Sequence, residues 1–353
     1  MKLLHLADLH LGSEMSARLT PSKAQTRRDE ICEAFLRAAK YAEQIGAQAI
    51  LLAGDAFDTA LPLRRDKEFF YGVVRAFPQI TFFYLKGNHD SAEEVEALPN
   101  LKTFGGAWTT YDLGEGVTLS GIELSAANSS SYYAGLALDP TKKNIVMLHG
   151  QIADGVGEEK IRLRSLAGKN IDYLALGHIH SYSSGAIDGR GTYAYAGCLE
   201  PRGFDEVGAK GFVVIDTAGQ TLSHAFVENC QRVVEEVTVD ISGCQDFAQA
   251  YRMVDGALSV DGADMPRIYL TGEVEMDTGN LADMVRRQLE GKYFAVSVKD
   301  HTTQALDLEK YRGQVSLEGE FVRVVLANAT LSEYQKKQVI ALGLKALSGE
   351  KLV

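Results

Sequence analysis

The sequence is poor in cysteine, and its few cysteines are not spaced for metal binding or redox chemistry. Only Cys32, Cys198, Cys230 and Cys244 occur among 353 residues. No two of them have the spacing of a zinc knuckle or a Cys-x-x-Cys pair, so a zinc finger and a thioredoxin-like site are excluded. Unpaired thiols are typical of a reducing compartment, and we expect a cytoplasmic protein.

The chain also lacks a surplus of positive charge. It has 36 Lys and Arg residues against 47 Asp and Glu residues, which gives a net charge of −11. This balance argues against a protein that grips nucleic acid tightly through its own charge. It does not argue against an enzyme that acts on nucleic acid, because bound metal ions supply local positive charge.

Long apolar runs are missing as well. No run reaches the roughly 18 residues that a membrane span requires, and no basic and apolar leader precedes the first predicted strand. We therefore expect no membrane partner. With 46% hydrophobic and 24% charged residues, the composition is that of a globular protein, and the length suffices for two domains or three small ones.

The apolar pattern of the first 230 residues predicts a mixed α/β (α+β) fold. Strands at 2–8, 49–53 and 81–85 alternate with helices at 22–45 and 66–77, which is typical of a parallel sheet covered by helices. More strands are predicted near 117–123, 145–149, 171–176, 192–196, 211–215 and 222–227. We expect these to form a second sheet, so that residues 1–230 make a two-sheet sandwich flanked by helices.

The pattern changes after residue 230. Strands at 232–240, 267–273 and 293–299 and helices at 245–258 and 279–290 predict a small α+β domain over residues 231–305. Two amphipathic helices are predicted in the remaining segment, 306–353, at 316–327 and 331–347. The sequence therefore predicts three parts, of which only the first contains sharp motifs.

Five short motifs at predicted strand ends contain most of the metal-binding side chains. They read Asp8-Leu9-His10, Gly54-Asp55-Ala56-Phe57-Asp58, Gly87-Asn88-His89-Asp90, His149-Gly150-Gln151 and Gly177-His178-Ile179-His180. Ligands of open α/β sheets gather at the carboxyl ends of the strands. One such histidine alone would be explained as a structural residue, whereas five motifs indicate a metal site. Oxygen and nitrogen ligands without thiolate suit manganese, iron or zinc, and two adjacent ions suit phosphodiester cleavage.

The order of these motifs resembles the calcineurin-like metallophosphoesterase superfamily and, within it, the SbcD-like DNA-repair exonucleases. The resemblance covers about residues 1–230, and the tracts 195–201 and 203–206 also resemble that branch. It implies two divalent ions, with manganese expected and iron or zinc as alternatives. The implied ligands are Asp8, His10, Asp55 and His180 for the first ion, and Asp55, Asn88, His149 and His178 for the second, so that Asp55 bridges.

The same resemblance implies roles for the residues beside these ligands. His89 would be the catalytic histidine rather than a ligand, and Asp90 would orient its ring. Asp58 closes the second motif and is expected to be a structural partner rather than a ligand. The chain resembles members of the superfamily in every expected ligand, which argues against a non-catalytic scaffold.

The implied function is a two-metal DNA exonuclease or endonuclease in double-strand-break or DNA-end repair. A phosphoesterase for a cyclic nucleotide or another nucleotide phosphoester is the alternative. The implied partners are DNA, an SbcC-type SMC-like ATPase that the C-terminal helices would contact, and a second copy of the chain at residues 66–77. Packing of the C-terminal helices within the chain is the alternative to docking. Either phosphate contact or ordinary solvation would explain the basic residues Arg64, Arg65, Lys67, Lys160, Arg162 and Arg164.

Overall fold

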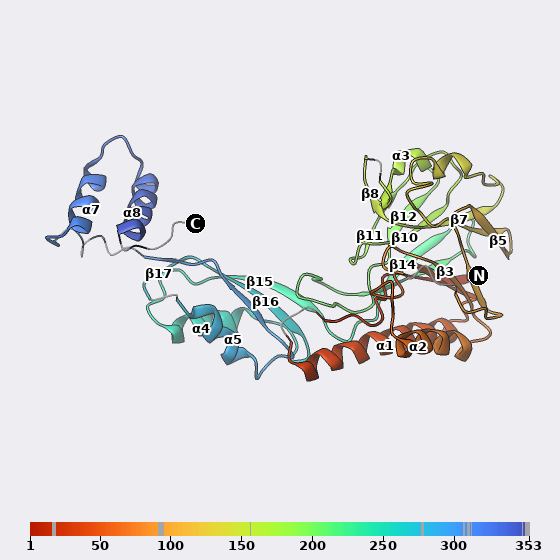
Figure 1. Ribbon diagram of the computed structural model, residues 1–353, viewed down its shortest axis with the longest axis horizontal. Coiled ribbons are helices and arrows are strands. Elements are labelled where there is room, and N and C mark those ends of the chain that lie inside the picture. The colour runs from red at the N-terminus through yellow and green to blue at the C-terminus, as the bar shows by residue number, and fades with distance from the viewer. Residues whose placement is uncertain are drawn as a thin grey trace. The chain divides into compact units, whose positions relative to one another are not determined.

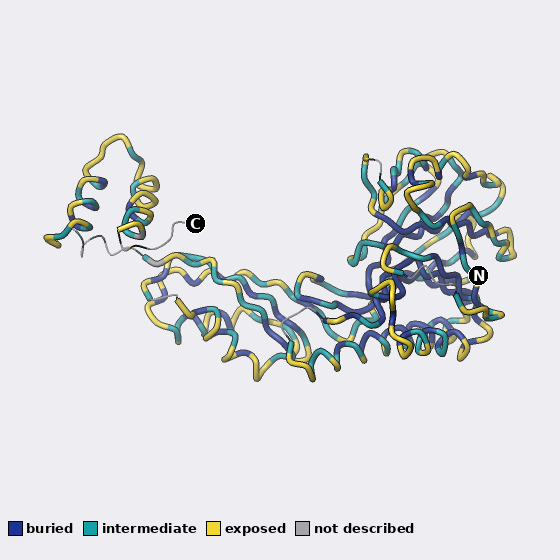
Figure 2. Tube along the Cα trace, viewed as in Figure 1, coloured by how far each residue is buried: buried dark blue, intermediate teal, exposed yellow. Residues whose placement is uncertain are grey.

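The chain divides into two compact units (Figure 1). The computed structural model describes residues 1–15, 19–90, 95–155, 157–276, 279–305, 308, 311, 313–347 and 349. The first unit comprises Met1–Glu235 and Gly262–Met265, and the second comprises Glu236–Asp261 and Pro266–Val353. In the first unit the central strands are buried, and the exposed positions lie on the outer helical faces, on edge strands and in loops (Figure 2).

Six strands form the first sheet of the first unit. Their order is β14 (Ser223–Glu228), β13 (Gly211–Asp216), β1 (Lys2–Leu6), β2 (Ala49–Ala53), β3 (Thr81–Leu85) and β4 (Leu101–Thr103). Strands β1 to β4 are parallel, whereas β13 and β14 are antiparallel additions beside β1. Helix α1 (Pro21–Gln44) connects β1 to β2, and helix α2 (Arg64–Ala76) connects β2 to β3. The predicted strand–helix alternation is therefore confirmed.

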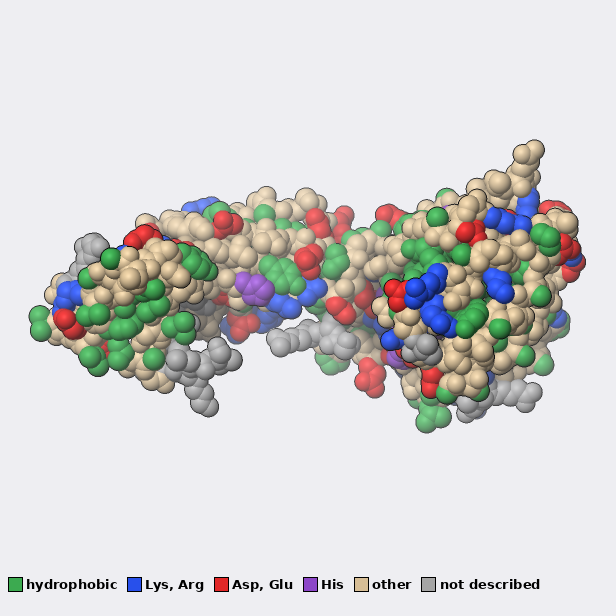
Figure 3. All heavy atoms as spheres, turned by 90° about the horizontal axis from the view of Figure 1, so that it is seen from above, with side chains coloured by type: hydrophobic (Ala, Val, Ile, Leu, Met, Phe, Trp, Pro, Cys, Tyr) green, Lys and Arg blue, Asp and Glu red, His purple; other side chains and the backbone are tan. Residues whose placement is uncertain are grey.

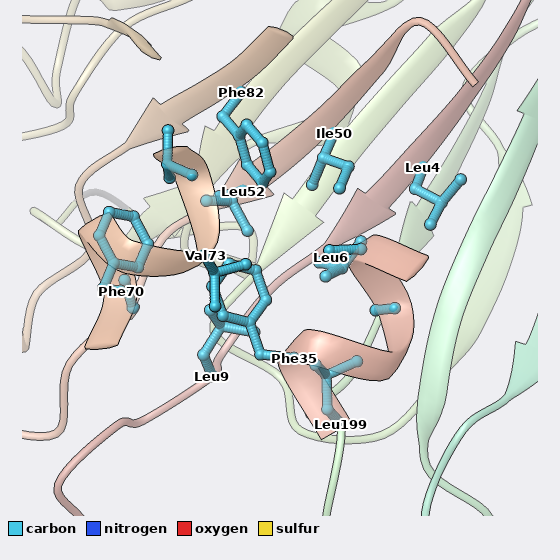
Figure 4. Close-up of a cluster of buried hydrophobic side chains, with 14 of the residues drawn as sticks. Leu4, Leu6, Leu9, Phe35, Ile50, Leu52, Phe70, Val73, Phe82 and Leu199 are labelled. Atoms are coloured by element: carbon cyan, nitrogen blue, oxygen red, sulfur yellow. The ribbon is translucent and has the colours of Figure 1, made fainter. Parts of the chain in front are cut away.

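Helices α1 and α2 cover one face of this sheet because alternate strand residues point toward them. Leu6 of β1, Leu52 of β2 and Phe82 of β3 pack with Phe35 of α1 and Phe70 of α2 in one buried cluster (Figure 4). Every second residue of a strand lies on the same face, so the intervening residues face the other way. Helix α1 is capped by Thr20, whose side chain accepts a hydrogen bond from the backbone N–H of Lys23.

Six further strands form the second sheet. Their order is β11 (Ser183–Ala186), β12 (Thr192–Tyr195), β10 (Tyr173–Gly177), β7 (Lys143–His149), β6 (Val117–Gly121) and β5 (Thr109–Gly114). The four central strands are parallel, and β11 and β5 are antiparallel edges. Leu51 and Phe83 of the first sheet pack against Ile145, Met147 and Tyr173 of the second. The predicted two-sheet sandwich is confirmed.

The outer face of the second sheet carries shorter elements. The 3-10 helix η1 (Tyr132–Gly135) and helix α3 (Leu163–Leu166) contribute Tyr132 and Leu166 to a cluster with Val146 and Leu148 of β7. A two-stranded ribbon of β8 (Gln151–Ile152) and β9 (Lys160–Ile161) follows β7 directly. The order of layers is thus helices, sheet, sheet and short helices.

Two strands that we expected in the second sheet belong to the first. Residues 211–215 and 222–227 lie in β13 and β14, and β13 pairs with β1 through contacts such as His5 with Val213. Both faces of β13 are buried, since Phe212 joins the helix-side cluster and Val213 joins the cluster between the sheets. An apolar run identifies such a strand, but it does not identify the sheet that the strand joins.

The second unit contains an α+β arrangement, as predicted. Strands β15 (Val234–Asp240), β16 (Met265–Thr271) and β18 (Ser297–Asp300) form a three-stranded sheet, and β17 (Glu273–Val274) pairs with β19 (Thr303–Gln304). Helices α4 (Phe247–Ala257) and α5 (Leu281–Leu289) pack on β16 through Val254, Val285 and Leu289. The buried side chains come from both helices and the sheet, which gives this unit its own core.

Helices α7 (Leu317–Ala327) and α8 (Glu333–Leu347) follow and pack on each other. Val322 and Val325 of α7 and Ile340 of α8 are buried between them. Both helices expose large apolar side chains on other faces, including Leu317 and Tyr334. Among the described residues, no helix is long and apolar enough to cross a membrane.

Candidate metal centre

The five motifs meet at one edge of the sandwich because their strands run parallel. Asp8 and His10 follow β1, Asp55 follows β2, and Asn88 follows β3, all in the first sheet. His149 ends β7, and His178 and His180 follow β10, in the second sheet. The seven candidate ligands predicted from the sequence are all brought together at this edge.

The first cluster consists of Asp8, His10, Asp55 and His180. Ligand atoms of Asp8, His10 and His180 lie within 4.8 Å of one another. The Nε2 atoms of His10 and His180 are 3.1 Å apart, and Nε2 of His10 is 3.9 Å from Oδ2 of Asp55. Asp8 and His10 are fully buried, so their donor atoms are directed into the protein rather than into solvent.

The second cluster consists of Asp55, Asn88, His149 and His178. Nε2 of His149 lies 3.3 Å from Oδ2 of Asp55 and 2.9 Å from Oδ1 of Asn88. The same amide oxygen is 3.3 Å from Nδ1 of His178. Because Oδ2 of Asp55 approaches a histidine of each cluster, this carboxylate lies where the two clusters join.

The donor atoms of the first cluster fit a divalent cation. Nδ1 of His180 lies 2.7 Å from a Glu206 carboxylate oxygen, and Nδ1 of His10 lies 2.9 Å from Oδ1 of Asp58. Nδ1 of His180 also lies 3.0 Å from Nη2 of Arg202, and the contact of His10 with Asp58 is close without hydrogen-bond geometry. The Nε2 atoms of the two rings face each other at 3.1 Å, and a cation between them would stabilise this arrangement. Imidazole and carboxylate donors without thiolate suit divalent metal ions.

The charges of the second cluster lead to the same conclusion. Burial opposes ionisation of Asp55, but hydrogen bonds from His149 and from the backbone of His89 hold its pKa well below the usual range. Burial also disfavours a charged His149, yet the hydrogen bond with Asp55 raises its pKa to about 9. The surrounding oxygens thus stabilise positive charge here, and a divalent cation competes with a proton for the same atoms.

The backbone is strained at several candidate ligands. Asp8, His10, Asp55 and His178 have φ values of 51°, 47°, 50° and 94°. Non-glycine residues with such positive φ cost on the order of 1–3 kcal/mol each and occur where the surrounding structure imposes them. Sharp turns at these strand ends bring side chains that are close in sequence, such as Asp8 and His10, to the same place.

His89 lies beside the first cluster and is exposed. Its ring is 5.1 Å from the ring of His10, and its Nδ1 is 3.1 Å from the backbone oxygen of Asp58. His10, Asp58 and His89 form a further group of close donor atoms. The Asp58 carboxylate in this group is paired with Arg202 at 2.6 Å, which fits the structural role expected for Asp58.

Asp90, which is expected to orient the ring of His89, holds backbone groups of two loops. The Asp90 carboxylate accepts hydrogen bonds from the backbone N–H groups of Ala56, Phe57 and Gly87. It therefore ties the loop after β2 to the loop after β3, and the carbonyl of Asp58 contacts the ring. The resemblance implies a role for Asp90 at the ring of His89, and that role stays a prediction.

Arg202 and Glu206 are supporting residues that sequence reasoning missed. Both lie in the loop after β12, and Glu206 is only 7% exposed and has a pKa of about 2. Burial would raise this pKa, but the hydrogen bond from His180 and the charge of Arg202 lower it. In the sequence, only the resemblance of tract 203–206 to the SbcD-like branch pointed to this loop, and that resemblance assigned no role to its residues.

The basic residues considered as phosphate contacts are mostly engaged with acids or aromatic rings. Arg64 pairs with Glu68 and Arg164 with Asp154, in both cases with exposed side chains. The guanidinium of Arg162 lies over the ring of Tyr133 at 4.8 Å. The two carboxylates offset the positive charge of Arg64 and Arg164.

Comparison with known proteins gives one family match and several distant relatives. The model of the calcineurin-like phosphoesterases matches residues 1–182. An uncharacterized metallophosphoesterase, YhaO of Bacillus subtilis, is 24% identical over 289 residues, which are 73% of this chain and 68% of that protein. A subunit of the nuclease SbcCD from Rhodobacter capsulatus is 33% identical over 101 residues, 28% of this chain and 23% of that protein. DNA double-strand break repair protein Mre11 of Aeropyrum pernix is 25% identical over 285 residues, 73% and 67% of the two chains.

Proposed function

Because the chain belongs to the calcineurin-like phosphoesterase family, whose members hydrolyse phosphoester bonds, we propose that it is a two-metal phosphodiesterase acting on DNA. The observation that carries this proposal is the position of Asp55. Its Oδ2 lies 3.3 Å from Nε2 of His149 and 3.9 Å from Nε2 of His10. One carboxylate at the meeting point of two clusters is suited to bridge two divalent ions.

In this proposal some residues of the centre hold cations, and His89 transfers a proton. The first and second clusters would each hold one ion, with manganese as the proposed metal. When bound, such a pair of ions polarises phosphoryl oxygens and supplies a reactive water at neutral pH. The backbone oxygen of Asp58 accepts from Nδ1 of His89. In the protonated ring Nε2 carries a second proton, which would stabilise charge on the phosphate or pass to the leaving sugar oxygen and leave the ring neutral.

Two relatives support DNA as the substrate. The names of Mre11 from Aeropyrum pernix and of the SbcCD protein from Rhodobacter capsulatus describe a DNA-break repair protein and a nuclease. The match to Mre11 extends over 73% of this chain, beyond the phosphoesterase motifs. We therefore assign the proposed activity to double-strand-break or DNA-end repair in the cytoplasm.

The pair of helices α7 and α8 is the proposed docking segment for an SbcC-type SMC-like ATPase. The two helices pack on each other, and packing within the chain is the alternative to docking. This packing nevertheless leaves several apolar side chains exposed. Leu317, Val324, Tyr334 and Leu342 are 70%, 62%, 72% and 51% exposed. Hydrophobic side chains gather over this end of the chain in Figure 3. A homodimer through residues 66–77 is a further proposal, supported only by the resemblance.

A small phosphoester is the second candidate substrate, and the charge distribution favours it. The net charge is −11, and Arg64 and Arg164 are already paired with carboxylates. Such a surface gives little electrostatic attraction for a long polyanion in the absence of a partner. The match to YhaO, a metallophosphoesterase described as uncharacterized, agrees equally with either substrate.

The two candidates are separated by manganese-dependent hydrolysis of bis-p-nitrophenyl phosphate and of radiolabelled linear DNA. We expect both to be cleaved by the full chain, and DNA cleavage to increase when the ATPase partner is added. Cleavage of the small ester without attack on DNA, with or without the partner, would favour the alternative. Absence of both activities in protein loaded with manganese would contradict the proposed phosphodiesterase.

A further inference from the structure

Arg202 lies between two carboxylates in the wall of the metal centre. Its Nη1 is 2.6 Å from Oδ1 of Asp58, and its Nη2 and Nε are 3.1 and 3.2 Å from Oε1 of Glu206. Its backbone N–H also donates to Oε2 of Glu206 at 2.7 Å. The planar guanidinium thus joins two acidic groups that are 148 positions apart in the sequence, a geometry that a lysine ammonium does not reproduce.

Each of these carboxylates contacts a histidine of the first cluster. Oε1 of Glu206 lies 2.7 Å from Nδ1 of His180, and Oδ1 of Asp58 lies 2.9 Å from Nδ1 of His10. A carboxylate at Nδ1 fixes the tautomer and the ring orientation of a metal-binding histidine and increases the basicity of its other nitrogen. Glu206 holds its ring by a hydrogen bond, whereas Asp58 approaches its ring closely without hydrogen-bond geometry, and the two Nε2 atoms lie 3.1 Å apart.

The loop that carries Arg202 is itself anchored by buried charges. Arg27 of α1 is fully buried and donates to Oε2 of Glu200 at 3.1 Å and to the carbonyl of Pro201 at 2.6 Å. Lys210, at the other end of the loop, donates to the carbonyl of His180 at 2.9 Å. These contacts hold the backbone on both sides of Arg202, so its side chain starts from a defined position.

The second cluster is supported differently. Nδ1 of His149 donates to the backbone oxygen of Ala53 at 2.9 Å. Throughout the described ranges of the chain, no contact joins Arg202 to Asn88, His149 or His178. A change at Arg202 therefore acts on the first cluster directly and reaches the second only through shared residues such as Asp55.

We propose that Arg202 is a positioning residue which orients His10 and His180, through Asp58 and Glu206 and through its own contact with Nδ1 of His180 at 3.0 Å, and thereby sets the affinity of one of two cation sites. The inference rests on the proposed function only in requiring two cations, and not on the identity of the substrate. Arg202 also lies beyond residues 1–182, so the family match does not include it.

The test is a titration of the metal-stripped full chain with Mn²⁺. Calorimetry measures the heat of binding, and electron paramagnetic resonance measures the concentration of free Mn²⁺. For Arg202→Ala we expect one site to weaken about 10–100-fold, the range typical of lost supporting contacts, and the other to change less than about threefold. Arg202→Lys keeps the charge but not the fork, so we expect it to restore little of the lost affinity.

Arg28→Ala is the matched control. Arg28 and Arg202 both line a cavity of about 740 Å³, but the guanidinium of Arg28 contacts Gln25. We expect this variant to bind both ions as the unmodified chain does. Unchanged binding in Arg202→Ala, equal weakening of both sites, or full restoration by lysine would each overturn the proposal. If Arg202→Ala does not fold, Glu206→Gln tests the same contact, and it must weaken one site only.

DNA cleavage is measured separately, so that the two proposals fail in different ways. An unmodified chain that binds two Mn²⁺ ions but leaves DNA intact would count against the nuclease. The effect of Arg202→Ala on the two affinities would still decide the role of Arg202.

Discussion

The two halves of the metal centre are held in place by different parts of the chain. In the first cluster, the side chains of Asp58 and Glu206 contact the rings of His10 and His180. In the second, the main-chain oxygen of Ala53 contacts the ring of His149. Support from side chains is removed by a single substitution, whereas support from the main chain changes only if the backbone moves.

Asp55 belongs to both halves, and its replacement has the largest expected effect. We expect Asp55→Ala to weaken both cation sites and to lower phosphodiesterase activity by at least about 10³-fold, because bound metals contribute several kcal/mol to catalysis. Metal titration and hydrolysis of bis-p-nitrophenyl phosphate measure the two losses. Asp112→Ala, at an exposed position paired with Lys142, is the control. Retention of one tight site in Asp55→Ala would show that the carboxylate is not shared.

His89 is expected to serve the reaction without holding either ion. His89→Ala should keep two bound Mn²⁺ ions and lose about 10²–10⁴-fold in kcat, the range typical of a lost general acid or base. Metal titration and steady-state kinetics on the same preparation separate these effects. His301→Gln, which removes a ring that contacts Tyr269, is the control. Normal activity in His89→Ala would remove this residue from catalysis.

Gly177 tests the main-chain support of the second cluster. A Cβ atom at this position would overlap the carbonyl oxygen of Ala53 and approach Nδ1 of His149 to 2.8 Å. We expect Gly177→Ala to lower the free energy of unfolding by about 1–3 kcal/mol and to weaken one cation site more than the other. Denaturant unfolding and Mn²⁺ titration measure the two effects.

Gly189→Ala is the matched control for Gly177→Ala, because no atom lies within 4 Å of its added Cβ. We expect this control to keep both the stability and the two affinities of the unmodified chain. Wild-type affinities in a folded Gly177→Ala variant would show that the main chain near Ala53 does not support the second cluster.

Glu159 has the smallest expected effect. Its carboxylate lies 4.0 Å from Nε2 of His178, and its side chain is 48% exposed. Exposed ion pairs contribute about 0–1 kcal/mol, so we expect Glu159→Gln to change either Mn²⁺ affinity by less than about fivefold. A tenfold loss at one site would show that the second cluster also depends on side-chain support.

The candidate ligands could be located from the sequence because each of them follows a recognisable strand. Apolar residues 49–53 and 81–85 were predicted as strands with the bounds that the structure has. Parallel strands place their carboxyl ends together, so the sequence predicts that Asp55 and Asn88 are neighbours at one edge of the sheet. Local patterns combined with one topological rule were sufficient for these residues.

Supporting residues such as Arg202 could not be located in this way, because they contact residues that are distant in sequence. Arg202 and Asp58 are 144 positions apart, and nothing in the residues around either one indicates the other. The membership of β13 in the first sheet was missed for a related reason, since strand pairing depends on the return path of the chain. Strand β11 was missed because its four residues are largely exposed and have no apolar alternation.

The positive φ angles of Asp8, His10, Asp55 and His178 have a consequence for the residues that these positions accept. Glycine adopts these angles without steric cost, so glycine at any one of the four positions would relieve backbone strain while deleting a metal-binding group. Glycine would also delete hydrogen bonds of these side chains, such as the one that Asp8 accepts from the backbone N–H of His178. At these turns it is therefore the side chain, and not the backbone conformation, that makes a residue other than glycine necessary.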